Sequence, residues 1–148
     1  NQRIRYVQED SQDEEALLQT LERELAFLHA ADRSQTETTL IVGTAAVPDF
    51  MEMQLFLPHG DALLKRLGLR GQIQIASFHP DFVFASSQAD DAANASNRSP
   101  YPTLHLIRED AIARAAASMD EPDSIYEANI ALLRQMGAAA IAQRMQLP

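Results

Sequence analysis

Residues 77–109 bring together two histidines and several carboxylates that could perform acid–base chemistry. His79 and Asp81 lie two positions apart, and His105 and Glu109 follow later in the same stretch. An imidazole with an ordinary pKa of about 6.5 exchanges protons near neutral pH, and a carboxylate can orient it. We therefore predict these four residues as candidate catalytic residues.

The same stretch carries donors that could bind an anion. Arginine binds carboxylate or phosphate with two parallel hydrogen bonds, and a rigid Ser-Pro-Tyr-Pro turn between two arginines could hold one. We predict a small anionic ligand bound by Asn97, Arg98, Ser99, Tyr101 and Arg108. The alternative is that both arginines pair with acids of the chain itself and fasten the stretch to the body; the candidate acids are Asp81, Asp90, Asp91 and Glu109.

Other chemistries have weaker support in the sequence. His79, Asp81 and His105 are ligand types of a mononuclear metal site, but no HxxxH or HExxH spacing is present, and structural hydrogen bonding of the histidines is the favoured alternative. We predict no metal site. Ser77 or Ser99 could act as a nucleophile, yet GxSxG and SxxK are absent, as are glycine-rich phosphate loops.

The elements around this stretch should place it at the end of a sheet. Alternating residues before Ser77 predict a strand over Gly71–Phe78 that Pro80 ends, with His79 at its edge, where α/β sheets usually bind ligands. Turn-forming residues predict a long loop over Ser86–Pro102. A short strand over Thr103–Glu109 follows, with His105 facing away from its two leucines, and it leads into a helix over Arg108–Ser118.

The first half of the chain predicts a strand–helix–strand unit followed by a second helix. Strands are expected over Arg3–Gln8 and Thr38–Gly43, joined by a helix over Gln12–Ala30 that begins with a Ser-x-x-Glu capping box at Ser11. The second helix is expected to be capped by Asp49, split or kinked at Pro58 and ended by Gly68, and a last helix opens near Asp120 with Pro122 in its first turn and continues to about Ala140.

These elements predict an α/β or α+β fold with a single small mixed sheet of about four strands and about four helices. The chain starts strand-helix-strand-helix-strand, and a parallel crossover or a ferredoxin-like arrangement would both fit. A length of 148 residues fits a single domain, 1–148.

Composition narrows the function classes. A net charge of −9 opposes binding to nucleic acid. No apolar run reaches the ~20 residues of a membrane helix, so we predict no membrane partner. The chain has no cysteine, which fits a reducing compartment, and we expect a cytoplasmic protein.

Two motifs, SFHPDFVF at 77–84 and NRSPYPTLHLIRE at 97–109, carry a resemblance to a family. The chain resembles a bacterial family named as domain of unknown function 1415, over nearly its whole length. Members of that family usually have a further N-terminal segment with a Cys-Pro-Phe motif, so the resemblance implies that such a segment is lacking here. The resemblance implies no mechanism and no cofactor.

Two functions remain open from the sequence. The first is a small-molecule enzyme or anionic-ligand-binding protein that uses the residues above. The second is a non-catalytic protein-interaction domain whose polar cluster is structural. The cofactor and the oligomeric state stay unknown at this point.

Overall fold

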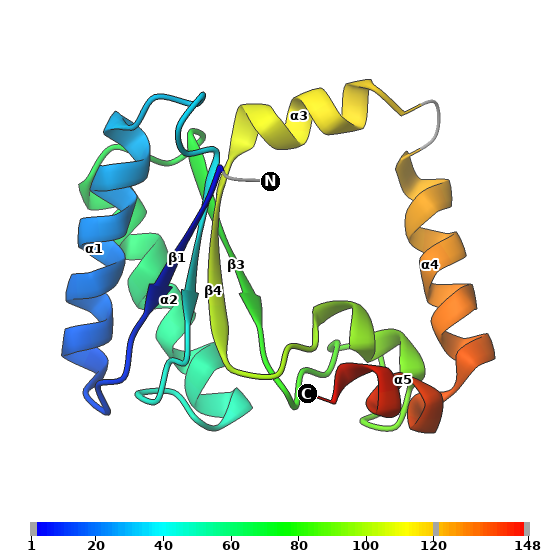
Figure 1. Ribbon diagram of the computed structural model, residues 1–148. Coiled ribbons are helices and arrows are strands. Elements are labelled where there is room, and N and C mark those ends of the chain that lie inside the picture. Colours follow the sequence, from blue (N-terminus) through cyan, green and yellow to red (C-terminus); the bar gives the residue numbers. More distant parts are fainter. Residues whose placement is uncertain (1–2, 120–121, 147–148) are drawn as a thin grey trace.

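A four-stranded mixed sheet lies at the centre of the computed structural model, which describes residues 3–119 and 122–146 (Figure 1). The strand order is β1-β2-β4-β3, in which β1 and β2 are parallel and β4 is antiparallel to both of its neighbours. This confirms the predicted mixed sheet and its strand-helix-strand-helix-strand start. The strands are β1 (Ile4–Gln8), β2 (Thr38–Val42), β3 (Ile73–Phe78) and β4 (Thr103–Arg108).

Two helices cover one face of this sheet (Figure 1). They are α1 (Glu14–Ala30) and α2 (Phe50–Arg66), which pack against each other and against the strands. Because side chains alternate along a strand, only every second residue of each strand enters this core. Eight large apolar side chains of this core are fully buried: Leu17, Leu21, Leu25, Leu28, Ile41, Met53, Leu104 and Leu106.

The first helix begins two residues later than its capping box predicts. Asp13 is the N-cap, and its carboxylate accepts a hydrogen bond from the Glu15 N–H. Ser11 instead accepts from the Asp13 N–H at 3.1 Å. The prediction of Ser11 as the cap was therefore wrong. Serine and aspartate both have the chemistry of a cap, and the two residues lie close enough in the sequence for either to serve.

A partly buried ion pair joins α1 to the edge strand β1. Glu24 of α1 is 1% exposed and accepts from Arg5 Nε at 2.7 Å, and Arg5 also lies over the Phe27 ring. Burial by itself raises the pKa of Glu24, but the hydrogen bonds from Arg5 and Arg23 outweigh it and lower that pKa below its usual value. The negative charge therefore stays on Glu24 and orients β1 on the helix.

The second helix is continuous across Pro58, so of the two predicted outcomes, a kink or a split, the split was wrong. The predicted box of Asp49 and Glu52 caps its start, and Gly68 follows its end with a φ of 69°. Gly60 is buried in the helix, where an added Cβ would lie 3.2 Å from Ile75 Cδ1. The lack of a side chain at Gly60 lets α2 lie directly on the sheet.

The C-terminal part forms an arm that leaves the sheet and returns to the long loop (Figure 1). It consists of α3 (Glu109–Ala117), α4 (Pro122–Met136) and α5 (Ala138–Met145), and the last two pack on a 3-10 helix, η1 (Ala92–Asn97), inside the predicted loop. The prediction of one last helix was wrong, because Gly137 with a φ of 79° separates α4 from α5. Its predicted start at Asp120 lies outside the described residues.

The second face of the sheet, which we call the open face, is not covered by α1 or α2. It is formed by the alternate strand residues: Ile4, Tyr6, Gln8, Thr38, Leu40, Val42, Gln74, Ala76, Phe78, Thr103, His105 and Ile107. Tyr6 is 68% exposed there. Within residues 3–119 and 122–146, no helix combines the length and apolar character needed to cross a membrane.

Candidate functional site

His79 follows β3 directly, as the sequence predicts, but its ring is fully buried. Nδ1 accepts a hydrogen bond from the Asp81 N–H at 3.0 Å, so the ring proton lies on Nε2, which donates to the Pro48 carbonyl at 3.0 Å. The Phe50 ring packs beside the imidazole. His79 is thus bonded to the backbone N–H of Asp81 and not to its carboxylate. Asp81 is an exposed residue. His79 joins the end of β3 to the segment that leads into α2.

Arg98 follows η1 and holds the loop together through backbone carbonyls. Its Nε donates to the Phe82 carbonyl at 3.0 Å and its Nη2 to the Ala89 carbonyl at 2.9 Å. Ser99 donates to the Tyr101 carbonyl, and the Asn97 carbonyl accepts from the His79 N–H. Arg98 therefore lies on carbonyl oxygens, and not on any of the four acids that the sequence offered as partners.

Asn94 is a structural residue that nothing in the sequence singles out. It is fully buried; its side-chain oxygen accepts from the Phe84 N–H and the Ser87 hydroxyl, and its nitrogen donates to the Gln88 carbonyl. One amide thus fixes the turn over residues 84–88. In the sequence, Asn94 is one of several turn-forming residues in the loop, and nothing in the local pattern distinguishes it from the others.

Arg108 and Glu109 lie at the opposite end of β4 from Tyr101. The six residues of β4 separate the two ends by roughly 20 Å at about 3.4 Å per residue. Arg108 is 7% exposed, and its Nη2 donates to the carbonyls of Ala31 and Thr36, both at 3.0 Å. The structure therefore does not bring all nine predicted residues together: two lie at one end of the sheet, His105 lies in the middle of β4, and the others lie at or beyond the opposite end.

His105 and Tyr101 are the predicted residues that lie toward the open face. Thr38 Oγ1 donates to the Leu106 carbonyl at 2.6 Å, so it accepts from His105 Nε2 at 2.7 Å, and Nδ1 is left as an acceptor. Burial lowers the pKa of His105. The imidazole is therefore neutral at neutral pH and presents a hydrogen-bond acceptor beside the Phe78 ring, 6.2 Å away between centroids.

A pocket of about 550 Å³ opens at the edge where β1 and β2 end. Tyr6, Gln8 and Val42 of the open face line it together with Asp10 and Tyr101. Both tyrosines are at least half exposed. Aromatic walls and one carboxylate are the groups that hold an apolar or cationic molecule, because an aromatic face attracts cations.

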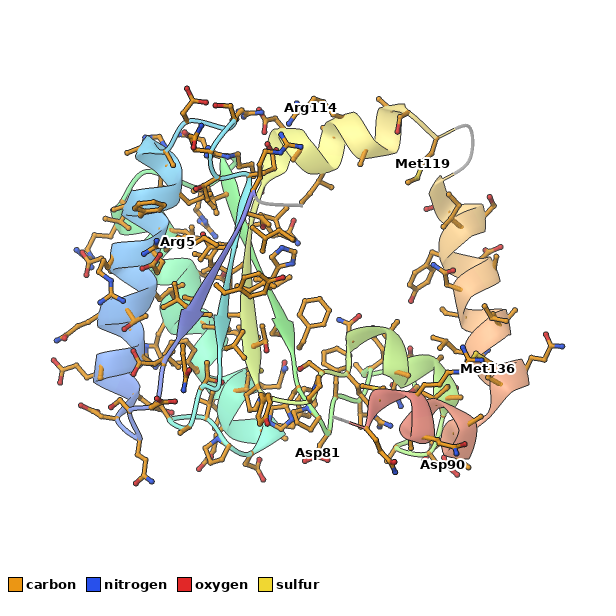
Figure 2. All side chains as sticks on the ribbon, in the orientation of Figure 1. Arg5, Asp81, Asp90, Arg114, Met119 and Met136 are labelled. Carbon is orange, nitrogen blue, oxygen red and sulfur yellow. The ribbon has the colours of Figure 1, made fainter. Side chains whose placement is uncertain are left out.

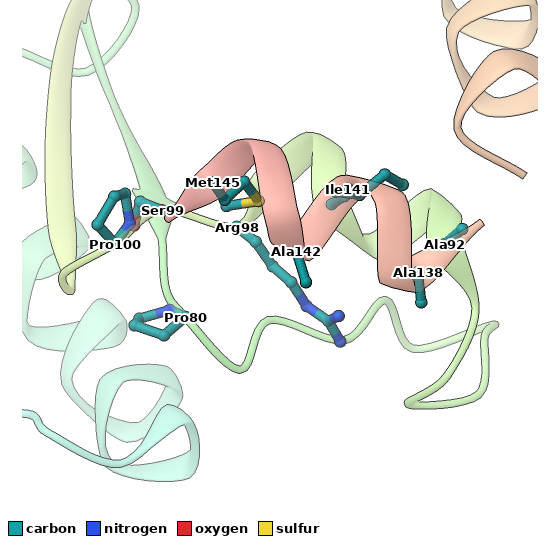
Figure 3. A pocket seen from close by; sticks show the side chains of 10 residues that line it. Pro80, Ala92, Arg98, Ser99, Pro100, Ala138, Ile141, Ala142 and Met145 are labelled. Atoms are coloured by element: carbon teal, nitrogen blue, oxygen red, sulfur yellow. The ribbon is translucent and has the colours of Figure 1, made fainter. Parts of the chain in front are cut away.

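A smaller pocket of about 280 Å³ lies between η1 and α5 (Figure 3). Its α5 wall is apolar, with Ile141 and Met145, and the long side chain of Arg98 forms part of the other wall. The two Arg98 hydrogen bonds described above are directed at the loop, so this guanidinium is already engaged. Nowhere in residues 3–119 and 122–146 do three His, Asp or Glu side chains gather closely enough to hold a metal ion.

Residues 1–143 match a family model whose description is "Protein of unknown function (DUF1415)". The chain belongs to this family. The resemblance drawn from the two motifs is thereby confirmed. No curated protein and no solved structure matches the chain. The family description assigns no activity, so the function follows from the geometry of the chain itself.

Proposed function

We propose that this member of the family is a non-catalytic interaction domain that binds a partner through the open face of its sheet. The observation that carries the proposal is the composition of that face. None of its twelve residues is Asp, Glu, Lys or Arg, although 22% of the chain is charged. A sheet face exposed to water is normally polar, and an uncharged exposed patch is typical of a binding surface.

The state of the predicted catalytic and ligand-binding groups supports the same function. Both nitrogens of His79 are used by backbone groups, and the guanidinium groups of Arg98 and Arg108 donate to carbonyls of the chain itself. A general base or an anion clamp needs free atoms directed at a substrate. These three residues instead bond to backbone groups of the chain itself, which is a structural role. The Arg108 Nε has no partner among the described residues, but it is buried.

Photocrosslinking would test the proposal. A photoreactive phenylalanine analogue is placed at Tyr6, on the open face, or at Leu55, on α2, since the two residues are 68% and 67% exposed. On irradiation in cells, we expect a discrete protein adduct from position 6 and none from position 55. Equal labelling from both positions, or no protein adduct from position 6, would contradict the proposal.

A small-molecule-binding function is the second candidate, because one observation favours it. The pocket beside Tyr6 and Tyr101 has a volume of about 550 Å³, within the range of ligand sites. Native mass spectrometry, combined with the crosslinking experiment, separates the two functions. A bound small molecule in the mass spectrum, together with no protein adduct from position 6, would favour the small-molecule-binding function. Loss of that mass in Tyr101→Ala would assign it to this pocket.

A further inference from the structure

The arm beside the open face carries apolar side chains that nothing in the described chain covers. α3 contains no buried residue, and none of residues 123–136 of α4 is buried. α4 runs back along the uncovered side of the sheet and contacts η1 and α5 near its end (Figures 1 and 2). Large apolar side chains on α3, α4 and the segment between them are at least 39% exposed: Ile112, Met119, Ile125, Tyr126 and Leu132.

The charges that border the open face are unbalanced. Three exposed arginines near this face have acidic partners, and two of them share one carboxylate. Arg3 and Arg114 both contact Glu37, which leaves one positive charge in excess, and Arg134 contacts Asp91. Three bordering acids have no cationic partner among the described residues: Asp10 after β1, and Asp123 and Glu127 on α4. The surroundings of the uncharged face therefore carry negative charge, as does the whole chain at −9.

The geometry of the face fits a helix. Four strands about 4.8 Å apart make a face roughly 15–20 Å wide, and a helix with its side chains is about 10–12 Å across. Sheets bury their apolar faces under helices, and the other face of this sheet is already covered by two. At least half of each of Tyr6, Tyr101 and Tyr126 is exposed, so large aromatic side chains on both the sheet side and the arm are available to a partner.

We propose that the partner of the open face is a basic amphipathic helix of another polypeptide. Its apolar side packs on Tyr6, Leu40 and Phe78 and on the exposed apolar side chains of α4, and its Lys and Arg residues lie near Asp10 and Glu127. A second copy of this chain fits less well, because two surfaces bordered by unpaired acids repel each other. This inference rests on the proposed function and names the chemistry of its partner.

A binding titration with a peptide tests this proposal. The probe is a fluorescein-labelled synthetic amphipathic helix of Leu and Lys, about 20 residues long, followed by fluorescence anisotropy at about 0.15 M and about 0.5 M salt. Tyr6→Glu is compared with Leu55→Glu, which makes the same charge change at equal exposure. Circular dichroism verifies that both variants fold.

The expected result is at least roughly tenfold weaker binding by Tyr6→Glu, although that variant adds negative charge, and unchanged binding by Leu55→Glu. Part of the wild-type affinity should remain in about 0.5 M salt, because apolar contacts are not screened. Equal binding by the two variants, or complete loss of binding at the higher salt, would overturn the proposal.

The crosslinking experiment distinguishes failure of this inference from failure of the proposed function. An adduct between position 6 and a second copy of the chain would overturn the basic helix and keep the interaction function. An adduct within one chain would overturn both. An adduct with a basic helical segment of another protein would support both.

Discussion

Arg98 shows, at the residue scale, how an apparent anion-binding arginine can be structural. We expect Arg98→Ala to lower the free energy of unfolding by about 1–3 kcal/mol, because two carbonyls lose a charged donor. For a chain of this size that is about 2–4 °C in Tm for each kcal/mol. Thermal unfolding followed by circular dichroism measures it. Arg70 is exposed, so Arg70→Ala serves as the control and should leave Tm unchanged. Equal melting temperatures for the two variants would indicate that Arg98 serves a ligand instead.

At the element scale, one ion pair holds the arm against the loop. Asp91 caps η1 through the Ala93 N–H, and Arg134 of α4 donates to both of its oxygens, at 3.1 and 2.8 Å. The hydrogen bond from Arg134, followed by that from Ala93, lowers the pKa of Asp91 from 3.8 to about 2. Because the folded pKa is depressed, the contribution of this pair is complete above the unfolded pKa of 3.8 and is lost as the pH falls toward about 2.

An NMR titration of the Asp91 carboxyl carbon would test this contact. We expect a midpoint near 2 in the wild-type protein and a clearly higher midpoint in Arg134→Gln, with Arg144→Gln, on exposed Arg144 of α5, unchanged. The Ala93 N–H should keep the Arg134→Gln midpoint somewhat below 3.8. If Arg134→Gln titrates like the wild type, α4 is not held to η1 in this way in solution.

At the scale of the whole molecule, stability should be unevenly distributed. The layer of α1, α2 and the sheet contains most of the buried apolar side chains, whereas α3 and α4 contribute none among the described residues. Regions with few buried contacts open more often than the core. We therefore expect amides of α3 and α4 to exchange with deuterium far faster than those of α1 and β4, by about two orders of magnitude or more. Uniform protection would mean that the arm is covered in solution.

The local pattern of the sequence was sufficient to predict most helices and strands and the side of a strand on which a single residue lies. The alternation in Thr103–Glu109 predicts that His105 faces away from Leu104 and Leu106, and Pro80 predicts that His79 ends a strand; both are confirmed. These predictions succeed because strand alternation and the restrictions of proline act between neighbouring residues. Where two equivalent signals lay close together, as with Ser11 and Asp13, local reasoning could not choose between them.

The partners of the polar groups and the uncovered face were decided only by tertiary structure. Arg108 donates to the carbonyl of Ala31, 77 residues away, and every residue has such a carbonyl, so no residue type in the sequence marks the contact. The same holds for Arg98 and for His79 with Pro48. That the open face is left without a helix follows from where α1, α2 and the arm pack, which depends on the whole chain at once.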